Sequence, residues 1–287
     1  MTASPGETMS ILETFTTAMS RAGSRLAKAL GSDVVVVPLV RMEGMIAPGG
    51  RSQGALSLAR VEKLLDKAFA YEDAPAVAIT VNSPGGSPVQ SRLICERIRA
   101  LAEEKDKPVL VFCEDLAASG GYMIACAGDE IFVDPASVVG SIGVISASFG
   151  FTGAMERLGV ERRIKTAGES KVLSDPFSEE TDAQKQRMER LLEAVHKQFI
   201  ALVKDRRGER LKTDLARFDG SIYTGEEAVE AGLVDSLGEA RAVLRERFGE
   251  KVRIKALSPP KGGLLARFTS SAMDVIETRA AWDRFSV

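Results

Sequence analysis

The residue best suited to do chemistry in this sequence is Ser119, within the segment Asp115-Leu-Ala-Ala-Ser-Gly-Gly-Tyr122. An apolar run, 108–113, precedes the segment, and a small uncharged run, 122–127, follows it. This order predicts a buried strand, a tight turn and a buried helix that starts beside Ser119. Glycines after a serine leave backbone N–H groups unshielded, as a serine nucleophile with an oxyanion hole requires. Taken alone, however, the segment fits an N-cap serine of a core helix better.

A serine nucleophile needs a base, and the sole histidine, His196, falls in a long predicted helix between polar neighbours. We expect a solvated surface histidine there, so the sequence does not predict a Ser-His-Asp triad. A lysine can replace the histidine where burial disfavours its charged form. Lys171 follows a glycine loop and has apolar neighbours, whereas Lys165 lies beside two arginines and is expected to be solvated. Without further information, an ordinary loop lysine is the simpler interpretation of Lys171.

Strands and helices alternate in the first half of the chain, which predicts an α/β domain with a mostly parallel sheet. Ligands bind such sheets at the carboxyl ends of the strands. The glycine turn Asn82-Ser-Pro-Gly-Gly86 follows the second predicted strand, and the Ser119 turn follows the third, so both fall at this edge. The predicted strands are 34–40, 76–81, 109–113 and 131–133, and the predicted helices are 56–70 and 89–101.

The second half of the chain is predicted to contain further elements. We expect a short strand at 161–166, a loop at 167–177, and a long helix capped by Ser178. An extended piece at 220–223 leads to a helix whose Thr224 and Glu227 match a capping box, and 251–257 is a last strand. The long helix is expected to bury the apolar side chains of Met188, Leu191, Leu192, Val195, Phe199 and Leu202.

Composition excludes several classes of protein. The 287 residues are 45% hydrophobic and 27% charged, with a net charge of -2, which is ordinary for a globular protein and gives no nucleic-acid footprint. Three dispersed cysteines argue against a disulfide framework and for buried thiols in a reducing, cytoplasmic compartment. No apolar run is long enough to span a bilayer, and no secretory signal is seen at the amino terminus.

The two ends of the chain have amphipathic patterns. Residues 11–30 predict a basic amphipathic helix that packs on its own domain or on a neighbouring subunit. The alternative is peripheral contact with the inner face of a membrane. Residues 258–263 are expected to form a linker, and 264–285 a terminal amphipathic helix.

Five short motifs occur in order along the chain and together resemble the signal peptide peptidase A family of serine peptidases. The resemblance covers about 33–257, and it divides the chain into an amino-terminal helical segment (1–32), a peptidase domain (33–257) and a linker with a terminal helix (258–287). The motifs are Asn82-Ser-Pro-Gly-Gly86, Ala118-Ser-Gly-Gly-Tyr122, Gly140-Ser-Ile-Gly-Val144, Gly168-Glu-Ser-Lys171, and Tyr223-Thr-Gly-Glu-Glu-Ala228 with Gly232-Leu-Val-Asp235.

The resemblance implies a crotonase/Clp-like α/β fold and a serine endopeptidase with a Ser-Lys dyad. Ser119 would be the nucleophile and Lys171 the general base. Ser141 would hydrogen-bond the lysine, and the N–H groups of Gly86 and Gly120 would form the oxyanion hole. The residues alone leave Ser141 open to being a buried turn serine. No metal or cofactor is expected.

The resemblance also implies peptide substrates, unfolded or already cleaved, with small or apolar side chains at the cut. We expect a homo-oligomer, in the form of a ring. Two alternatives use the same fold. A crotonase-type acyl-CoA enzyme would need the glycine donors but neither Ser119 nor Lys171, and a non-catalytic oligomeric scaffold would need none of these residues.

Overall fold

The computed structural model describes residues 34–48, 55–168, 171–212 and 214–257. The two predicted terminal helices and the linker at 258–263 lie outside these residues. Among the helices that the structure describes, none is both long enough and apolar enough to cross a membrane.

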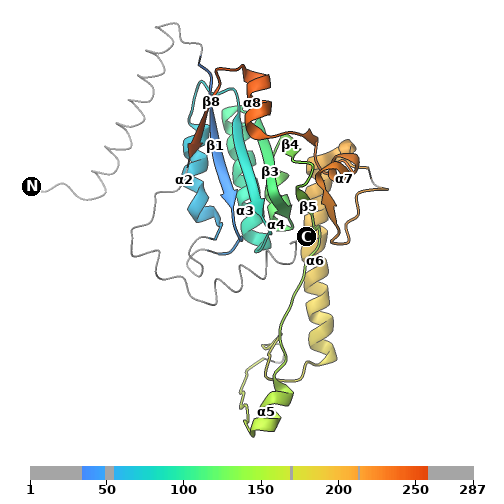
Figure 1. The fold of residues 1–287 in the computed structure, drawn as a ribbon. Helices are drawn as coiled ribbons and strands as arrows, with labels where there is room; N and C mark the ends of the chain where they lie inside the picture. The colour runs from blue at the N-terminus through green and yellow to red at the C-terminus, as the bar shows by residue number, and fades with distance from the viewer. Residues whose placement is uncertain (1–33, 49–54, 169–170, 213, 258–287) are drawn as a thin grey trace, which may run out of the picture.

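The described domain is built on one eight-stranded sheet in the order β6-β5-β3-β2-β1-β8, with β4 pairing with β3 and with β7 (Figure 1). All pairs are parallel except β5 with β6, so the prediction of a mostly parallel sheet is confirmed. The strands are β1 (Val36–Glu43), β2 (Val77–Ser83), β3 (Val109–Ala118), β4 (Glu130–Val133), β5 (Val138–Gly140), β6 (Ile222–Thr224), β7 (Ser236–Leu237) and β8 (Arg253–Leu257).

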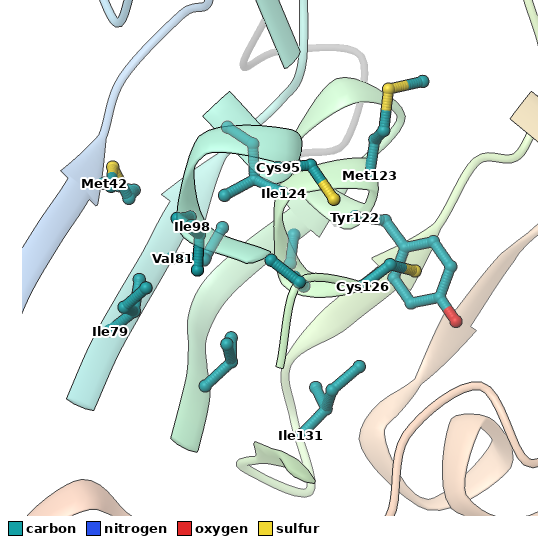
Figure 2. Packing of buried hydrophobic residues seen from close by; sticks show 14 of the residues in the cluster. Met42, Ile79, Val81, Cys95, Ile98, Tyr122, Met123, Ile124, Cys126 and Ile131 are labelled. Carbon is teal, nitrogen blue, oxygen red and sulfur yellow. The ribbon is translucent and has the colours of Figure 1, made fainter. Parts of the chain in front are cut away.

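Helices cover both faces of the sheet, which is why the central strands are apolar throughout. Successive strand residues point to opposite faces. Ile79 and Val81 therefore join the larger core with α2, α3 and α4, while Ala78 joins a smaller core closed by Leu244 of α8 (Figure 2 shows part of the larger core). The helices are α2 (Leu58–Phe69), α3 (Pro88–Lys105), α4 (Gly120–Ala125), α5 (Thr152–Leu158), α6 (Asp182–Arg207), α7 (Gly225–Glu230) and α8 (Ala240–Phe248), with a 3₁₀ turn at Gly208–Arg210.

Helix α6 belongs to the domain only at its C-terminal end. Figure 1 shows it running away from the sheet, with α5 near its far end. Its buried residues are Phe199, Val203 and Arg207, and Leu191 is 48% exposed. The predicted buried stripe is therefore confirmed only at Phe199: Leu191 is exposed, and Met188, Leu192, Val195 and Leu202 are half-buried, because α6 runs away from the sheet. We call residues 144–181, which include α5, the arm.

Two further predictions about this region are wrong. The cap of α6 is Thr181, whose hydroxyl accepts the Gln184 N–H while the Gln184 side chain accepts the Thr181 N–H; the Ser178 hydroxyl instead donates to Asp175. Residues 161–166 form no strand and are exposed. They lie in the arm, where no described strand is available to pair with them.

The C-terminal end of α6 is bound next to the C-terminal end of α4, the helix that follows Ser119. Arg207 is buried and binds Asp235 through two hydrogen bonds of 2.9 Å, and it also donates to the Gly232 carbonyl. Its neighbour Arg206 donates to the carbonyls of Cys126 and Gly128, just past the end of α4. The direction in which α6 leaves the domain is thus set next to α4.

Candidate active site

Two glycine turns meet at the carboxyl edge of the sheet, as the sequence predicts. One follows β2 at Gly85 and Gly86, and the other follows β3 at Ser119 and Gly120. A Cβ atom added to Gly85 would lie 2.8 Å from the Cβ of Ser119 and 2.8 Å from the Gly120 nitrogen. The turns are therefore in direct contact, although they are separated by α3 in the sequence.

Ser119 has a backbone conformation that is unusual for a serine. Its φ of +53° lies in the left-handed region, where a side chain is strained. The residue is half-buried, and its N–H donates to the Gly140 carbonyl at 2.8 Å. Its side chain makes no capping hydrogen bond to α4. The simpler interpretation, an N-cap serine, is therefore not supported, and the hydroxyl is not committed to the helix.

The predicted oxyanion-hole donors, Gly86 and Gly120, are the residues that follow the contacting pair Gly85 and Ser119. Gly86 is exposed, with a φ of +140°, and a Cβ there would overlap the Ile46 carbonyl oxygen at 2.0 Å. Gly120 begins α4, and the first N–H groups of a helix have no partner within it. The structure thus brings Gly86, Ser119 and Gly120 to one place on the sheet edge.

An irregularity in β3 places Ser119 at this edge. The register between β2 and β3 shifts between Val81 and Ser83, so β3 carries extra residues there. The Asn82 side chain closes the irregularity by donating to Asp115 at 2.7 Å and accepting the Leu116 N–H at 3.2 Å. Asn82 thus supports the part of β3 that leads to Ser119.

Ser141 lies next to the residue that accepts the Ser119 N–H. Its φ is +50°, its N–H donates to the Ser221 carbonyl at 2.8 Å, and its own carbonyl accepts the Gly143 N–H. The backbone of Ser141 is therefore fixed close to Ser119, while the side chain is half-buried. This placement is compatible with both sequence interpretations, a dyad-supporting hydroxyl and a turn serine.

Lys171 is not brought to Ser119 within one chain. It is exposed and lies in the arm, where the neighbouring Val172 carbonyl accepts a hydrogen bond from Gln184 at 2.9 Å. Gln184 lies in the first turn of α6. Further along α6, His196 contacts the Ile142 carbonyl, next to Ser141, at 2.9 Å. The two positions on α6 are separated by about 18 Å at 1.5 Å per residue. A lysine side chain cannot span that distance.

Burial keeps two titratable side chains that follow Ser119, Tyr122 and Cys126, in their protonated forms near neutral pH. Burial raises the pKa of the Cys126 thiol to about 12 and raises that of the Tyr122 hydroxyl, which donates to the Leu233 carbonyl. Burial also raises the pKa of Glu114, opposed by Arg41 at 3.8 Å. His196 is half-buried instead of solvated, because its ring nitrogen contacts the Ile142 carbonyl.

Sequence reasoning missed the polar side chains that support the two turns. Ser83 and Ser91 are fully buried beneath them, and Ser91 Oγ would be 2.3 Å from a Cβ on Gly120. It also missed the pair of Arg207 with Asp235. The spacing of Ser91 from Ile94 and Ile98 on one helix face was an available signal, whereas no local pattern marks Ser83 or links residues 207 and 235.

A model of peptidase family S49 matches residues 102–252, which is just over half of the chain. The matched range begins in α3 and contains Ser119, Ser141 and Lys171. The Gly86 turn lies before it.

Curated relatives match over longer parts of the chain. A Na(+)/H(+) antiporter NhaA of Brucella abortus (strain 2308) is 51% identical over 83% of this chain and 32% of its own length. A putative signal peptide peptidase SppA of Enterococcus faecium is 32% identical over 61% of this chain and 51% of its own length. The chain therefore spans about a third to a half of these relatives, and the antiporter name describes a much longer protein.

A solved structure has a similar fold. It is a mutant of 1510-N, a membrane-bound stomatin-specific protease, in complex with a substrate peptide. The TM-score is 0.51 at 17% identity, over 86% of this chain and 98% of that one. At this identity the likeness concerns the fold, and it confirms the predicted crotonase/Clp-like architecture.

Proposed function

The chain belongs to peptidase family S49, and from this premise we propose that it is a serine peptidase with Ser119 as its nucleophile and Lys171 as its general base. The observation that carries the assignment is the position of Ser119. Its hydroxyl is not used for capping, its backbone is strained, and it contacts the Gly85 turn at the edge where parallel sheets bind ligands. The acyl-CoA enzyme and the scaffold, which the fold alone left open, have no such need for Ser119.

The proposed reaction has two halves. The neutral amine of Lys171 accepts the proton of Ser119 Oγ, which bonds to the carbonyl carbon of the substrate. The resulting oxyanion is stabilised by the N–H groups of Gly86 and Gly120, and one such donor contributes about 3 kcal/mol. Lys171 then gives its proton to the leaving amine as the C–N bond breaks. In the second half Lys171 takes a proton from a water molecule, whose oxygen bonds to the ester carbon; the ester C–O bond then breaks, and Lys171 returns the proton to Ser119 Oγ.

The proposal includes assembly of several chains, because Lys171 is too far from Ser119 of its own chain. We propose that the arm of one protomer lies over the sheet edge of its neighbour in a closed ring. Burial disfavours the charged form of an amine, so an interface over Lys171 would leave a proton acceptor there. The arm offers unusually exposed apolar side chains for such an interface: Ile145, Phe149, Phe151, Leu158, Val160, Ile164 and Phe177.

We further propose that the substrates are unfolded or already cleaved peptides with small or apolar side chains at the cut. The 1510-N complex supports the peptide class, since that protease was solved with a substrate peptide. The buried free cysteines Cys95, Cys113 and Cys126 support a reducing compartment, and we place the enzyme in the cytoplasm. Peripheral contact of residues 11–30 with a membrane stays a prediction.

A fluorophosphonate probe tests the assignment, because it reacts with activated serines. We expect the wild-type protein to be labelled on Ser119 and the Ser119→Ala and Lys171→Ala variants to be unlabelled. The Lys165→Ala variant is the matched control, since Lys165 is an exposed lysine of the same arm. Equal labelling of wild type and Ser119→Ala would overturn the assignment of the nucleophile, and unchanged labelling of Lys171→Ala that of the base.

A further inference from the structure

We propose that Ser83 is a positioning residue that holds the two oxyanion-hole donors at their working separation, an inference that rests on the proposed function. Ser83 is the last residue of β2 and its side chain is fully buried. Its hydroxyl donates to the Gly44 carbonyl at 2.7 Å and accepts the Gly85 N–H at 3.2 Å. Both hydrogen-bonding functions of the hydroxyl are therefore used at the base of the glycine turn.

The contact with the Gly85 N–H fixes the turn that carries Gly86. Gly85, held by Ser83 through its N–H, accepts the Ile46 N–H at 2.8 Å, and the Ile46 carbonyl accepts the Ser87 N–H at 2.7 Å. The peptide groups on both sides of Gly86 are thus bound to the segment 44–46. Gly85 and Gly86 both have positive φ and have no side chains to hold them, so the orientation of this part of the turn depends on these hydrogen bonds.

The backbone of Ser83 also touches the other turn. A Cβ atom added to Gly121 would lie 2.6 Å from the Ser83 carbonyl oxygen and 3.1 Å from the Ser83 Cβ. Gly121 lies in the first turn of α4, next to Gly120. One residue therefore binds the turn of the first donor and packs against the helix of the second.

This arrangement matters for the rate of reaction more than for substrate binding. An oxyanion hole works when both donors lie at hydrogen-bonding distance from the oxyanion of the transition state. Removing the Ser83 hydroxyl leaves the buried Gly85 N–H and the half-buried Gly44 carbonyl without this partner. The turn would then settle elsewhere, which lowers kcat and leaves KM nearly unchanged, since interactions made only in the transition state are lost.

The test compares Ser83→Ala and Ser83→Cys with wild type in peptide hydrolysis. Cysteine keeps the volume but bonds weakly, so we expect kcat to fall in the order Ser, Cys, Ala, by about tenfold or more for alanine. KM should stay within about twofold. The affinity of a peptide aldehyde, which forms an oxyanion-bearing adduct, should fall by a similar factor. Glu239→Ala, which removes the cap of α8 on the opposite face, should lose stability but keep kcat per folded enzyme.

The outcomes separate the two proposals. Wild-type enzyme without peptidase activity or labelling of Ser119 would overturn the proposed function. An active wild type whose folded Ser83→Ala variant keeps its kcat and its aldehyde affinity would overturn only the role of Ser83. If the alanine variant does not fold, the cysteine variant decides: a lower kcat at unchanged KM supports positioning, and wild-type kinetics contradict it.

Discussion

Gly85 and Ser119 are in contact across two loops, with only 2.8 Å between the Ser119 Cβ and the place where a Gly85 Cβ would be. Gly85 also has a φ of +96°, which a residue with a side chain rarely adopts. A side chain at position 85 would therefore collide with the nucleophile.

Gly85→Ala should consequently disable the site. Strain at the turn and the clash with Ser119 both displace the predicted donors, and a displacement near 1 Å can cost about 100-fold in rate. The rate of fluorophosphonate labelling measures the loss. Gly249→Ala is the control, because Gly249 has a similar φ of +91° but lies outside the arm, with nothing within 4 Å of the added Cβ. Equal labelling rates for the two variants would contradict the proposed geometry.

Ser119→Gly should make the protein more stable while abolishing activity. Glycine adopts a φ of +53° without the strain that serine has there, so we expect a gain of about 1 kcal/mol. Thermal unfolding should show a midpoint a few degrees higher, about 2–4 °C for a domain of this size. Ser119→Ala keeps the strain and should show no such gain. A Ser119→Gly variant less stable than Ser119→Ala would show that the backbone is not strained.

The parts of the site that follow from the sequence are local. Ser119, Gly120 and Gly86 each lie in a turn directly after a buried strand, and parallel strands bring such turns to one edge. The capping box at Thr224 and Glu227 was predictable for the same reason. Periodicity and turn chemistry act over a few residues, so the sequence displays them.

The parts that did not follow depend on distant neighbours. Leu191 has the spacing of a buried residue, yet half of α6 lies outside the domain. Ser178 is a good capping residue, but Thr181 forms a reciprocal pair with Gln184 and replaces it. The separation of Lys171 from Ser119 depends on the direction of α6, which is set by the buried contact of Arg207.

Removing Asp235 should destabilise the domain strongly. Asp235→Asn leaves the buried guanidinium of Arg207 without its charged partner, a change that typically costs about 3 kcal/mol. Denaturant unfolding measures the loss. Glu130→Gln is the control, because its pair with Arg247 is more exposed and should be worth less than about 1 kcal/mol. Similar losses of unfolding free energy for both variants would show that the Arg207–Asp235 pair stabilises the domain no more than an exposed pair does.

The same pair predicts the direction of a pH effect. Burial alone would raise the pKa of Asp235, but the hydrogen bonds and charge of Arg207 keep it below the ordinary value. A carboxyl group with a lowered folded-state pKa stabilises the protein above its unfolded pKa, about 3.9, and loses that contribution as the pH falls further. The difference in stability between wild type and Asp235→Asn should therefore be constant near neutral pH and shrink below about pH 4. A difference that grows on acidification would contradict this assignment.

Mixing two inactive variants should restore activity if neighbouring chains share each site. In a mixed ring, a working site needs Ser119 from a Lys171→Ala chain and Lys171 from a Ser119→Ala chain. Equal random mixing therefore gives about one quarter of wild-type activity, provided that the contact is head-to-tail around a closed ring. The variants are unfolded, mixed, refolded together and assayed for peptide hydrolysis. Each variant refolded alone is the control. If the mixture is as inactive as the separate variants while wild type regains activity, Lys171 serves Ser119 of its own chain, and the arm must fold back by a bend in α6.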